Sequence, residues 1–141
     1  MTDTLQSCMQ TFVEYINSAD PAIGAAIISP EALFHVPFSD SALQGLAGYE
    51  QVLGMMRGGF SDIRWTLEET IIEGDAVAAR FTLCGTHDGT FFGVPATGTA
   101  VVATAVNLYR FHDGLIVGER GMPDLLAILT QIGAVPDPAA S

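Results

Sequence analysis

The sequence predicts an α+β fold in which a curved antiparallel sheet packs against helices and encloses an apolar pocket. Apolar residues recur at helical spacing near the start of the chain, whereas from residue 61 onward they alternate with the period of a β-strand. Helices followed by a run of long strands are typical of two packed layers. Small side chains at Ala79, Ala103 and Ala105 would leave a cavity beneath the sheet, or would instead let a helix pack close.

The length and composition fit a single domain. A chain of 141 residues has the usual size of one domain, and 49% hydrophobic residues are enough for a sizeable core. No linker or internal repeat interrupts the sequence. We therefore assign residues 1–135 to one domain and residues 136–141 to a frayed C-terminal tail.

The charge balance excludes several classes of function. Five arginines stand against 16 Asp and Glu residues, which gives a net charge of −11, and the chain has no lysine. A surface this acidic repels phosphate backbones, so we expect no nucleic-acid partner. Without lysine the protein cannot form a Schiff base, bind pyridoxal phosphate through a lysine or build a P-loop.

The expected location is the cytoplasm. No apolar run approaches the roughly 20 residues that cross a bilayer, so we expect no membrane partner. The opening segment MTDTLQSCMQ lacks the basic and apolar regions of a signal peptide. Cys8 and Cys84 lie far apart and form no CxxC motif, so we expect two reduced thiols.

Helical patterns occur at both ends of the domain. Apolar spacing predicts an amphipathic helix over residues 5–16. An Asp-Pro pair, with a capping residue followed by proline at the first helical position, predicts a second helix over residues 20–28 that Ser29-Pro30 ends. A third helix is expected over residues 49–56, and a last one over residues 123–133 that a glycine terminates.

Alternating patterns predict the strands and the direction of their side chains. Glu73-Gly74 and Asp113-Gly114 suit tight turns between neighbouring strands. The predicted strands cover residues 32–36, 63–68, 77–87, 99–111 and 115–121. By alternation, the residues expected to face inward include Trp65, Phe81, His87, Asn107, Tyr109, Glu119 and Gly121.

Three segments of the sequence resemble one protein family. They are GTHDGTFFGVPATG (residues 85–98), NLYRFHDGLIV (residues 107–117) and MPDLLAILTQIGAVP (residues 122–136). Together with the helices before them, they are similar to the SnoaL-like polyketide cyclases. The resemblance implies the cone-shaped α+β fold shared with nuclear transport factor 2 and ketosteroid isomerase, which hosts many chemistries.

The resemblance also implies a reaction. Members of this family close a polyketide ring by intramolecular aldol condensation without metal or organic cofactor. They use an aspartate on the last strand and a histidine on the neighbouring strand. At those positions this chain has Gly121 and Asn107, so both catalytic residues are absent.

Glu119 is the candidate general acid/base. It stands two residues before Gly121, so both residues should project from the same face of the strand. An apolar cavity disfavours the charged form of a carboxylate and raises its pKa toward neutrality. The competing interpretation is an ion pair with Arg110 or Arg120 at the rim of the cavity.

Two histidines have candidate roles. His35 follows Phe34 on a short strand that lines the pocket in the family fold, where it could bond a substrate carbonyl or move a proton. A purely structural role is the alternative. His87 faces inward by alternation and would either contact the substrate or pin the loop at residues 89–98 through hydrogen bonds.

Other residues complete the predicted substrate site. Asn107 can bond a substrate oxygen in place of the family histidine. By the resemblance, Tyr15 matches a first-helix position that contacts substrate, although its spacing fits plain core equally well. Asp124 lies in the first turn of the last helix, where a carboxylate also favours the helix dipole. Inward-facing aromatic residues add Trp65, Phe81 and Tyr109 to this set.

We expect neither a metal nor a cofactor. The three histidines are too dispersed to form a metal-ligand pattern, and the sequence has no nucleotide-binding fingerprint.

We also expect a homodimer or a larger homo-oligomer. The resemblance implies association through the outer face of the sheet, where β-rich side chains would form an apolar surface. The outward-facing residues are Val102, Thr104, Val106 and Leu108.

The leading hypothesis is a cofactor-independent cyclase, or a related lyase or isomerase, that acts on an apolar, oxygenated, polyketide-like substrate. Glu119 would move a proton next to a carbonyl, while Asn107 and His35 hold the enolate oxygen. One alternative is an epoxide hydrolase on the same fold, whose Asp-Arg-Asp set this chain does not supply. The other alternative is a non-catalytic module that binds a small apolar ligand.

Overall fold

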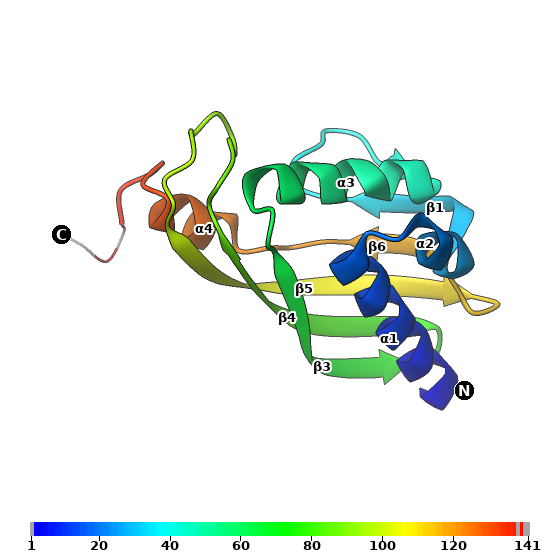
Figure 1. Cartoon of the computed structure of the whole chain (residues 1–141). Coiled ribbons are helices and arrows are strands. Elements are labelled where there is room, and N and C mark those ends of the chain that lie inside the picture. The colour runs from blue at the N-terminus through cyan, green and yellow to red at the C-terminus, as the bar shows by residue number, and fades with distance from the viewer. Residues whose placement is uncertain (1, 138, 140–141) are drawn as a thin grey trace.

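The computed structural model describes residues 2–137 and 139, and it confirms the α+β architecture. Helices cover one face of a single curved sheet in this part of the chain (Figure 1). The helices are α1 (Thr2–Ser18), α2 (Pro21–Ile27), α3 (Gly45–Gly59) and α4 (Leu125–Gln131). The strands are β1 (Ile28–His35), β2 (Leu43–Gln44), β3 (Arg64–Glu73), β4 (Ala76–Thr86), β5 (Ala100–His112) and β6 (Leu115–Arg120). Of the predicted tail, residues 138, 140 and 141 lie outside the described residues.

The sheet brings the first and last strands of the chain, β1 and β6, side by side. Its strand order is β2-β1-β6-β5-β4-β3, and the pairing is antiparallel except between β1 and β6. The predicted antiparallel sheet therefore contains one parallel pair. A parallel pair needs a long crossover connection, which α3 and the three strands after it supply here.

Both boundaries of the second helix agree with the prediction to within one residue. Asp20 caps α2 as predicted, since its carboxylate accepts the Ala22 N–H at 2.9 Å. The helix ends at Ile27, within one residue of the prediction, and Ser29-Pro30 lies at the beginning of β1. Proline is tolerated there because the pairing of β1 with β6 shifts register between Ile28 and Leu33, so no ladder N–H is required at that point.

The core lies between α1, α3 and the inner face of the sheet. Met9, Phe12 and Tyr15 of α1 are fully buried. The ring of Phe12 stands 5.3 Å from the rings of both Tyr49 on α3 and Tyr109 on β5, in edge-to-face geometry. This aromatic cluster ties both helices to the middle of the sheet.

Two side-chain amides close the exposed edges of strands. Asn17 of α1 donates to the Trp65 carbonyl at 2.9 Å and accepts the Trp65 N–H at 2.8 Å, which fixes the edge strand β3. Gln131 of α4 binds β5 in the same way: it donates to the Val102 carbonyl at 2.8 Å and accepts the Val102 N–H at 3.0 Å. At this point β6 is too short to pair with β5. Each amide occupies the backbone groups of one residue, which shortens the open edge that could recruit another chain.

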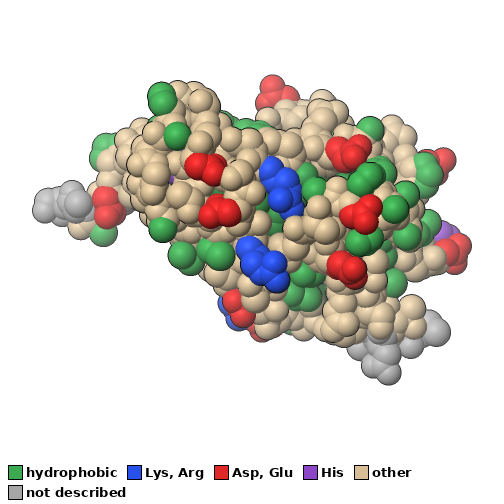
Figure 2. Space-filling view, in the orientation of Figure 1, with side chains coloured by type: hydrophobic (Ala, Val, Ile, Leu, Met, Phe, Trp, Pro, Cys, Tyr) green, Lys and Arg blue, Asp and Glu red, His purple; other side chains and the backbone are tan. Residues whose placement is uncertain are grey.

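Acidic side chains outnumber basic ones on the surface. Figure 2 shows carboxylate side chains spread over the visible face, with basic side chains in only a few isolated groups. Within the described residues, no helix is long and apolar enough to cross a membrane.

The loop between β4 and β5 folds onto the end of α3. Both Asp88 N–H and Gly89 N–H donate to the Gly59 carbonyl at 3.1 Å, and the Asp88 carboxylate accepts the Ser61 N–H at 3.0 Å. A Cβ atom at Gly89 would overlap the carbonyl oxygen of Gly58. The close approach of two backbone segments therefore requires glycine at this position.

We predict that Gly89→Ala destabilises the fold by about 1–3 kcal/mol, because the loop must move away from α3. The matched control is Gly54→Ala, at a position in α3 where an added Cβ meets nothing within 4 Å. Alanine favours helix there by up to about 1 kcal/mol. Urea denaturation measures both effects, and equal stabilities for the two variants would contradict this packing.

Candidate active site

A cavity lies between α3 and the inner face of the sheet. Tyr49, Val52 and Met56 of α3 form one side of it. The strands line the other side with Trp65, Leu83, Ala105, Asn107, Glu119 and Gly121. Ala105 is one of the three small residues that predicted a cavity, and Ala103 borders a second, smaller void next to it.

Glu119 is the one acidic residue buried in the described part of the chain, with 3% of its surface exposed. It lies on β6 between two buried neighbours, Tyr109 on β5 and Phe34 on β1. Its Oε1 atom has no hydrogen-bond partner among the described residues. The alternative of a rim ion pair does not hold, because Arg110 pairs with Asp75 at 3.5 Å on the surface.

Burial makes Glu119 a group that titrates near neutrality. Removal from water raises the pKa of its carboxyl group from 4.5 to about 7. A hydrogen bond from Tyr109 lowers the pKa and offsets a smaller part of this effect. A carboxyl group with such a pKa can both accept and donate a proton at physiological pH.

Gly121 makes room beside the Glu119 carboxyl group. A Cβ atom at position 121 would stand 3.9 Å from the Glu119 carboxyl carbon and 3.7 Å from Asn107 Oδ1. A side chain at position 121 would therefore project toward the place that the Glu119 carboxyl group occupies.

Asn107 is held in one orientation in the cavity wall. Its Oδ1 accepts the Met122 N–H at 2.9 Å, so its Nδ2 is the donor that reaches the Tyr109 hydroxyl at 3.0 Å. An amide nitrogen carries two protons, and the second one remains for a ligand oxygen.

His35 does not line the cavity. Phe34 pairs with Glu119 and His35 pairs with Arg120 across the β1–β6 ladder. Phe34 and Glu119 are buried on the inner face, so His35 and Arg120 lie on the outer face. The sequence argument left a substrate-binding role and a structural role open for His35, and this position corresponds to the structural alternative.

His87 is buried in the loop that it was expected to pin. Its Nδ1 atom lies 2.8 Å from Thr97 Oγ1 and accepts the Thr97 N–H at 3.2 Å. The ring also packs 5.5 Å from the ring of Phe60. This geometry corresponds to the loop-pinning alternative, since His87 does not line the cavity.

The remaining predicted residues divide between cavity and core. Trp65 lines the cavity. Tyr15, Phe81 and Tyr109 are buried in the core behind it and do not line it. Asp124 caps α4, because its carboxylate accepts the Ala127 N–H at 3.0 Å, which corresponds to its structural alternative.

Sequence reasoning missed the side of the cavity that α3 forms. Tyr49, Val52 and Met56 are spaced three and four residues apart, a pattern that signals one buried helix face but not what that face contacts. It also missed Phe38, whose ring lies 6.1 Å from the ring of Phe92 in the β4–β5 loop. These two rings join the loops on either side of the cavity.

The cavity is small. It holds about 40 Å³, whereas ligand pockets commonly hold about 300–1,000 Å³. A larger ligand therefore requires side chains at its boundary to move. Within residues 2–137 and 139, no three His, Cys, Asp or Glu side chains gather in an arrangement that could hold a metal ion.

The fold and the buried carboxylate define a small α+β protein with an acid/base group in an apolar pocket. The profile of the SnoaL-like polyketide cyclase family matches residues 6–132. The chain belongs to this family, which confirms the resemblance carried by its last three segments.

Related sequences are named as cyclases. Aklanonic acid methyl ester cyclase of Streptomyces peucetius is 33% identical over 108 residues, which cover 75% of this chain and 71% of that protein. Nogalonic acid methyl ester cyclase of Streptomyces nogalater is also 33% identical over 108 residues, which cover 75% of this chain and 80% of that protein.

Solved structures share the whole fold. IdmH from Streptomyces antibioticus has a TM-score of 0.82 and 29% identity, covering 91% of this chain and 97% of that chain. TsrD from Streptomyces laurentii has a TM-score of 0.84 and 26% identity, covering 96% of this chain and 98% of that chain.

We predict that Glu119→Gln stabilises the protein in a pH-dependent way. The folded state keeps the Glu119 proton between pH 4.5 and about 7, where the unfolded state has lost it. The wild type therefore loses stability as the pH rises through this window, and the glutamine variant is spared that loss. The difference should reach about 3 kcal/mol above pH 7.

Denaturant titrations at several pH values measure this difference. Glu14→Gln removes an exposed carboxylate and serves as the control, with a small and flat effect expected. A difference for Glu119→Gln that does not change between pH 4 and pH 8 would show that the buried carboxyl group does not titrate near neutrality.

Proposed function

We propose that the protein is a cofactor-independent polyketide cyclase in which Glu119 moves a proton next to a substrate carbonyl. Membership of the SnoaL-like polyketide cyclase family supports ring closure as the reaction. The observation that carries the proposal is the buried Glu119 carboxyl group, with a pKa of about 7 and an oxygen without a partner among the described residues.

The proposed reaction is an intramolecular aldol addition. Ionised Glu119 accepts a proton from the carbon next to one carbonyl, and the electron pair of that C–H bond passes into an enolate. The enolate carbon attacks a second carbonyl of the same molecule and forms the new C–C bond. The alkoxide oxygen then takes the proton back from Glu119, so no atom or electron is gained or lost and the carboxylate is regenerated.

Asn107 is the proposed donor to the enolate oxygen. Its Oδ1 is engaged by the Met122 N–H, so the free proton on Nδ2 is the group that can meet an oxyanion. A donor fixed in advance stabilises developing charge without reorganising during the reaction. His35, expected to share this role, lies on the outer face, so the proposal rests on Asn107 alone.

The proposed substrate is an apolar, polycarbonyl compound of the polyketide class. The names of the relatives, which act on aklanonic and nogalonic acid methyl esters, support this class. Apolar and aromatic side chains dominate the cavity, which suits fused or ring-forming carbon skeletons. Because the cavity is small, we propose that Phe38 and Phe92 separate to admit the substrate.

The two alternatives fit the site less well. An epoxide hydrolase needs two acids and an arginine around the reacting water, but among the described residues Glu119 is the one charged group that lines the cavity. A non-catalytic binding module would not require a titrating carboxyl group in its pocket. A ligand that binds but is not converted would support this binding module.

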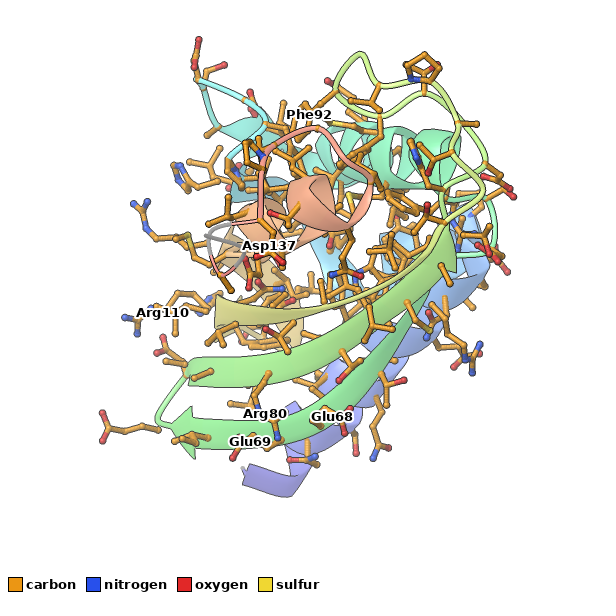
Figure 3. All side chains as sticks on the ribbon, turned by 90° about the vertical axis from the view of Figure 1, so that its left-hand side faces the viewer. Glu68, Glu69, Arg80, Phe92, Arg110 and Asp137 are labelled. Carbon is orange, nitrogen blue, oxygen red and sulfur yellow. The ribbon has the colours of Figure 1, made fainter. Side chains whose placement is uncertain are left out.

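We also propose that a second copy of this chain covers the outer face of the sheet. Val102, Val106 and Leu108 are 51–59% exposed there in a row on β5. Beside them on the same face lie Arg80, which pairs with Glu69 at 2.7 Å, and Arg110 (Figure 3). Carboxylates and arginines thus flank an apolar stripe. In a dimer with a two-fold axis, the arginines of one copy could lie opposite the carboxylates of the other.

For the catalytic role, we predict that Glu119→Gln lowers turnover of aklanonic or nogalonic acid methyl ester about 100-fold or more. Glutamine keeps the shape of the side chain but cannot exchange the proton. Substrate binding should change little. Turnover by mass spectrometry and affinity by calorimetry separate the two effects.

A double variant tests whether a carboxyl group at this place restores turnover when another residue carries it. Glu119→Gln/Gly121→Asp returns a carboxylate to the same place from the neighbouring inward position, since a side chain at 121 projects toward the Glu119 carboxyl carbon. We expect it to recover part of the lost turnover. Full activity in Glu119→Gln would refute the mechanism, and tight binding without turnover in the wild type would favour the binding module.

For assembly, we predict a sedimentation mass of twice 14.9 kDa at micromolar concentration. Val106→Glu should shift the protein to the monomer, because it places a charge in the apolar stripe. Gln10→Glu adds the same charge to an exposed position of α1, on the opposite side of the sheet, and should leave the mass unchanged. A wild-type monomer would rule out this interface.

A further inference from the structure

A directed chain of hydrogen bonds ends beside Glu119. It begins at the Met122 N–H, which donates to Asn107 Oδ1 at 2.9 Å and so fixes the orientation of the amide. Asn107 Nδ2 then donates to the Tyr109 hydroxyl at 3.0 Å. Because the tyrosine oxygen accepts this bond and a hydroxyl carries a single proton, that proton is free to point at another acceptor.

Glu119 is the cross-strand neighbour that can serve as this acceptor. Tyr109 and Glu119 are direct partners across the β5–β6 ladder, and they are 1% and 3% exposed. The Tyr109 hydroxyl lowers the pKa of Glu119 through a hydrogen bond, against the larger effect of burial. Glu119 Oε1 is buried without a partner in the described part of the chain, so the carboxylate has unused hydrogen-bonding capacity.

We propose that Tyr109 is a positioning residue, whose O–H donates to the Glu119 carboxylate and so sets how readily that group exchanges its proton with the substrate. The proposal rests on the acid/base role proposed for Glu119. Tyr109 does not line the cavity, so it acts through Glu119 and not by touching the substrate. This differs from the substrate-binding role that alternation predicted for it.

Few other groups face Glu119. From α3, Tyr49 lies near enough for the Glu119 charge to raise the pKa of its own hydroxyl. From α1, Tyr15 packs 6.0 Å from the ring of Tyr49, and its buried hydroxyl has no partner among the described residues. On the β1 side the neighbour is Phe34, and no arginine or histidine of the described chain lines the cavity. Tyr109 is therefore the polar group that contacts the carboxylate most directly.

The test is an infrared titration of the ligand-free protein. The carbonyl stretch of protonated Glu119, identified by its absence in Glu119→Gln, reports the pKa of this residue without any substrate. Tyr109→Phe keeps the ring and removes the O–H, so the pKa should rise by about one pH unit. Tyr15→Phe removes a buried hydroxyl from the same aromatic cluster and should leave the pKa unchanged.

A second substitution moves the pKa in the opposite direction. Fluorotyrosine at position 109 has a more acidic O–H, which donates more strongly, so the pKa of Glu119 should fall. This variant also keeps the test decisive if Tyr109→Phe does not fold. An unchanged pKa in either Tyr109 variant, or an equal rise in Tyr15→Phe, would overturn the proposal.

Kinetics then separate positioning from the proposed function. With a higher pKa, less Glu119 is ionised at pH 7, so kcat of Tyr109→Phe should fall about fivefold with little change in KM. The alkaline shift of its pH profile should match the infrared shift. An infrared shift in a protein that turns over no substrate would refute the cyclase proposal but leave the positioning role of Tyr109 intact.

Discussion

The site depends on one unfavourable interaction, the removal of the Glu119 carboxyl group from water. Burial strongly destabilises the charged form of the carboxyl group, and this raises its pKa to about 7. The same cost gives a carboxyl group that exchanges protons under neutral conditions. Folding stability and chemical competence are therefore opposed at this residue, a trade-off common in catalytic sites.

The surrounding fold keeps water away while leaving one oxygen free. Glu119 lies in the middle of the sheet, flanked by Phe34 and Tyr109 on neighbouring strands. The α1 and α3 helices cover this region through the aromatic cluster around Phe12. Closing the edge of β3 through Asn17 holds Trp65 at the far wall of the cavity. Together these contacts bury the Glu119 carboxyl group, which is 3% exposed.

The Glu119 carboxyl group lies next to the position at which the family resemblance implies a catalytic aspartate. The family resemblance placed an aspartate at the position of Gly121, and the structure leaves room there for the Glu119 carboxyl group. Two inward positions of one strand lie close enough to present a carboxylate to the same space. The proposed role of Glu119 would keep the location of the functional group while changing the residue that carries it.

The sequence by itself determined the fold class, the family and the inward direction of Asn107, Tyr109 and Glu119. Alternation along long strands is a local property, so it can be read without knowing which strands are neighbours. The sequence could not show which way the His35 side chain points, because the face of a short strand depends on its register with β6, which only the folded chain reveals.

Tertiary structure alone decided which inward residues reach the cavity. Tyr109 and Phe81 share a face of the sheet with Asn107. Helices pack over these two residues, so they are buried in the core and do not line the cavity, whereas Asn107 does. The contribution of α3 and the small cavity volume also follow from packing, because the space between two layers is set by side chains from both. The sequence could identify the carboxylate. Only the packing around it could show how deeply that group is buried and which oxygen is free.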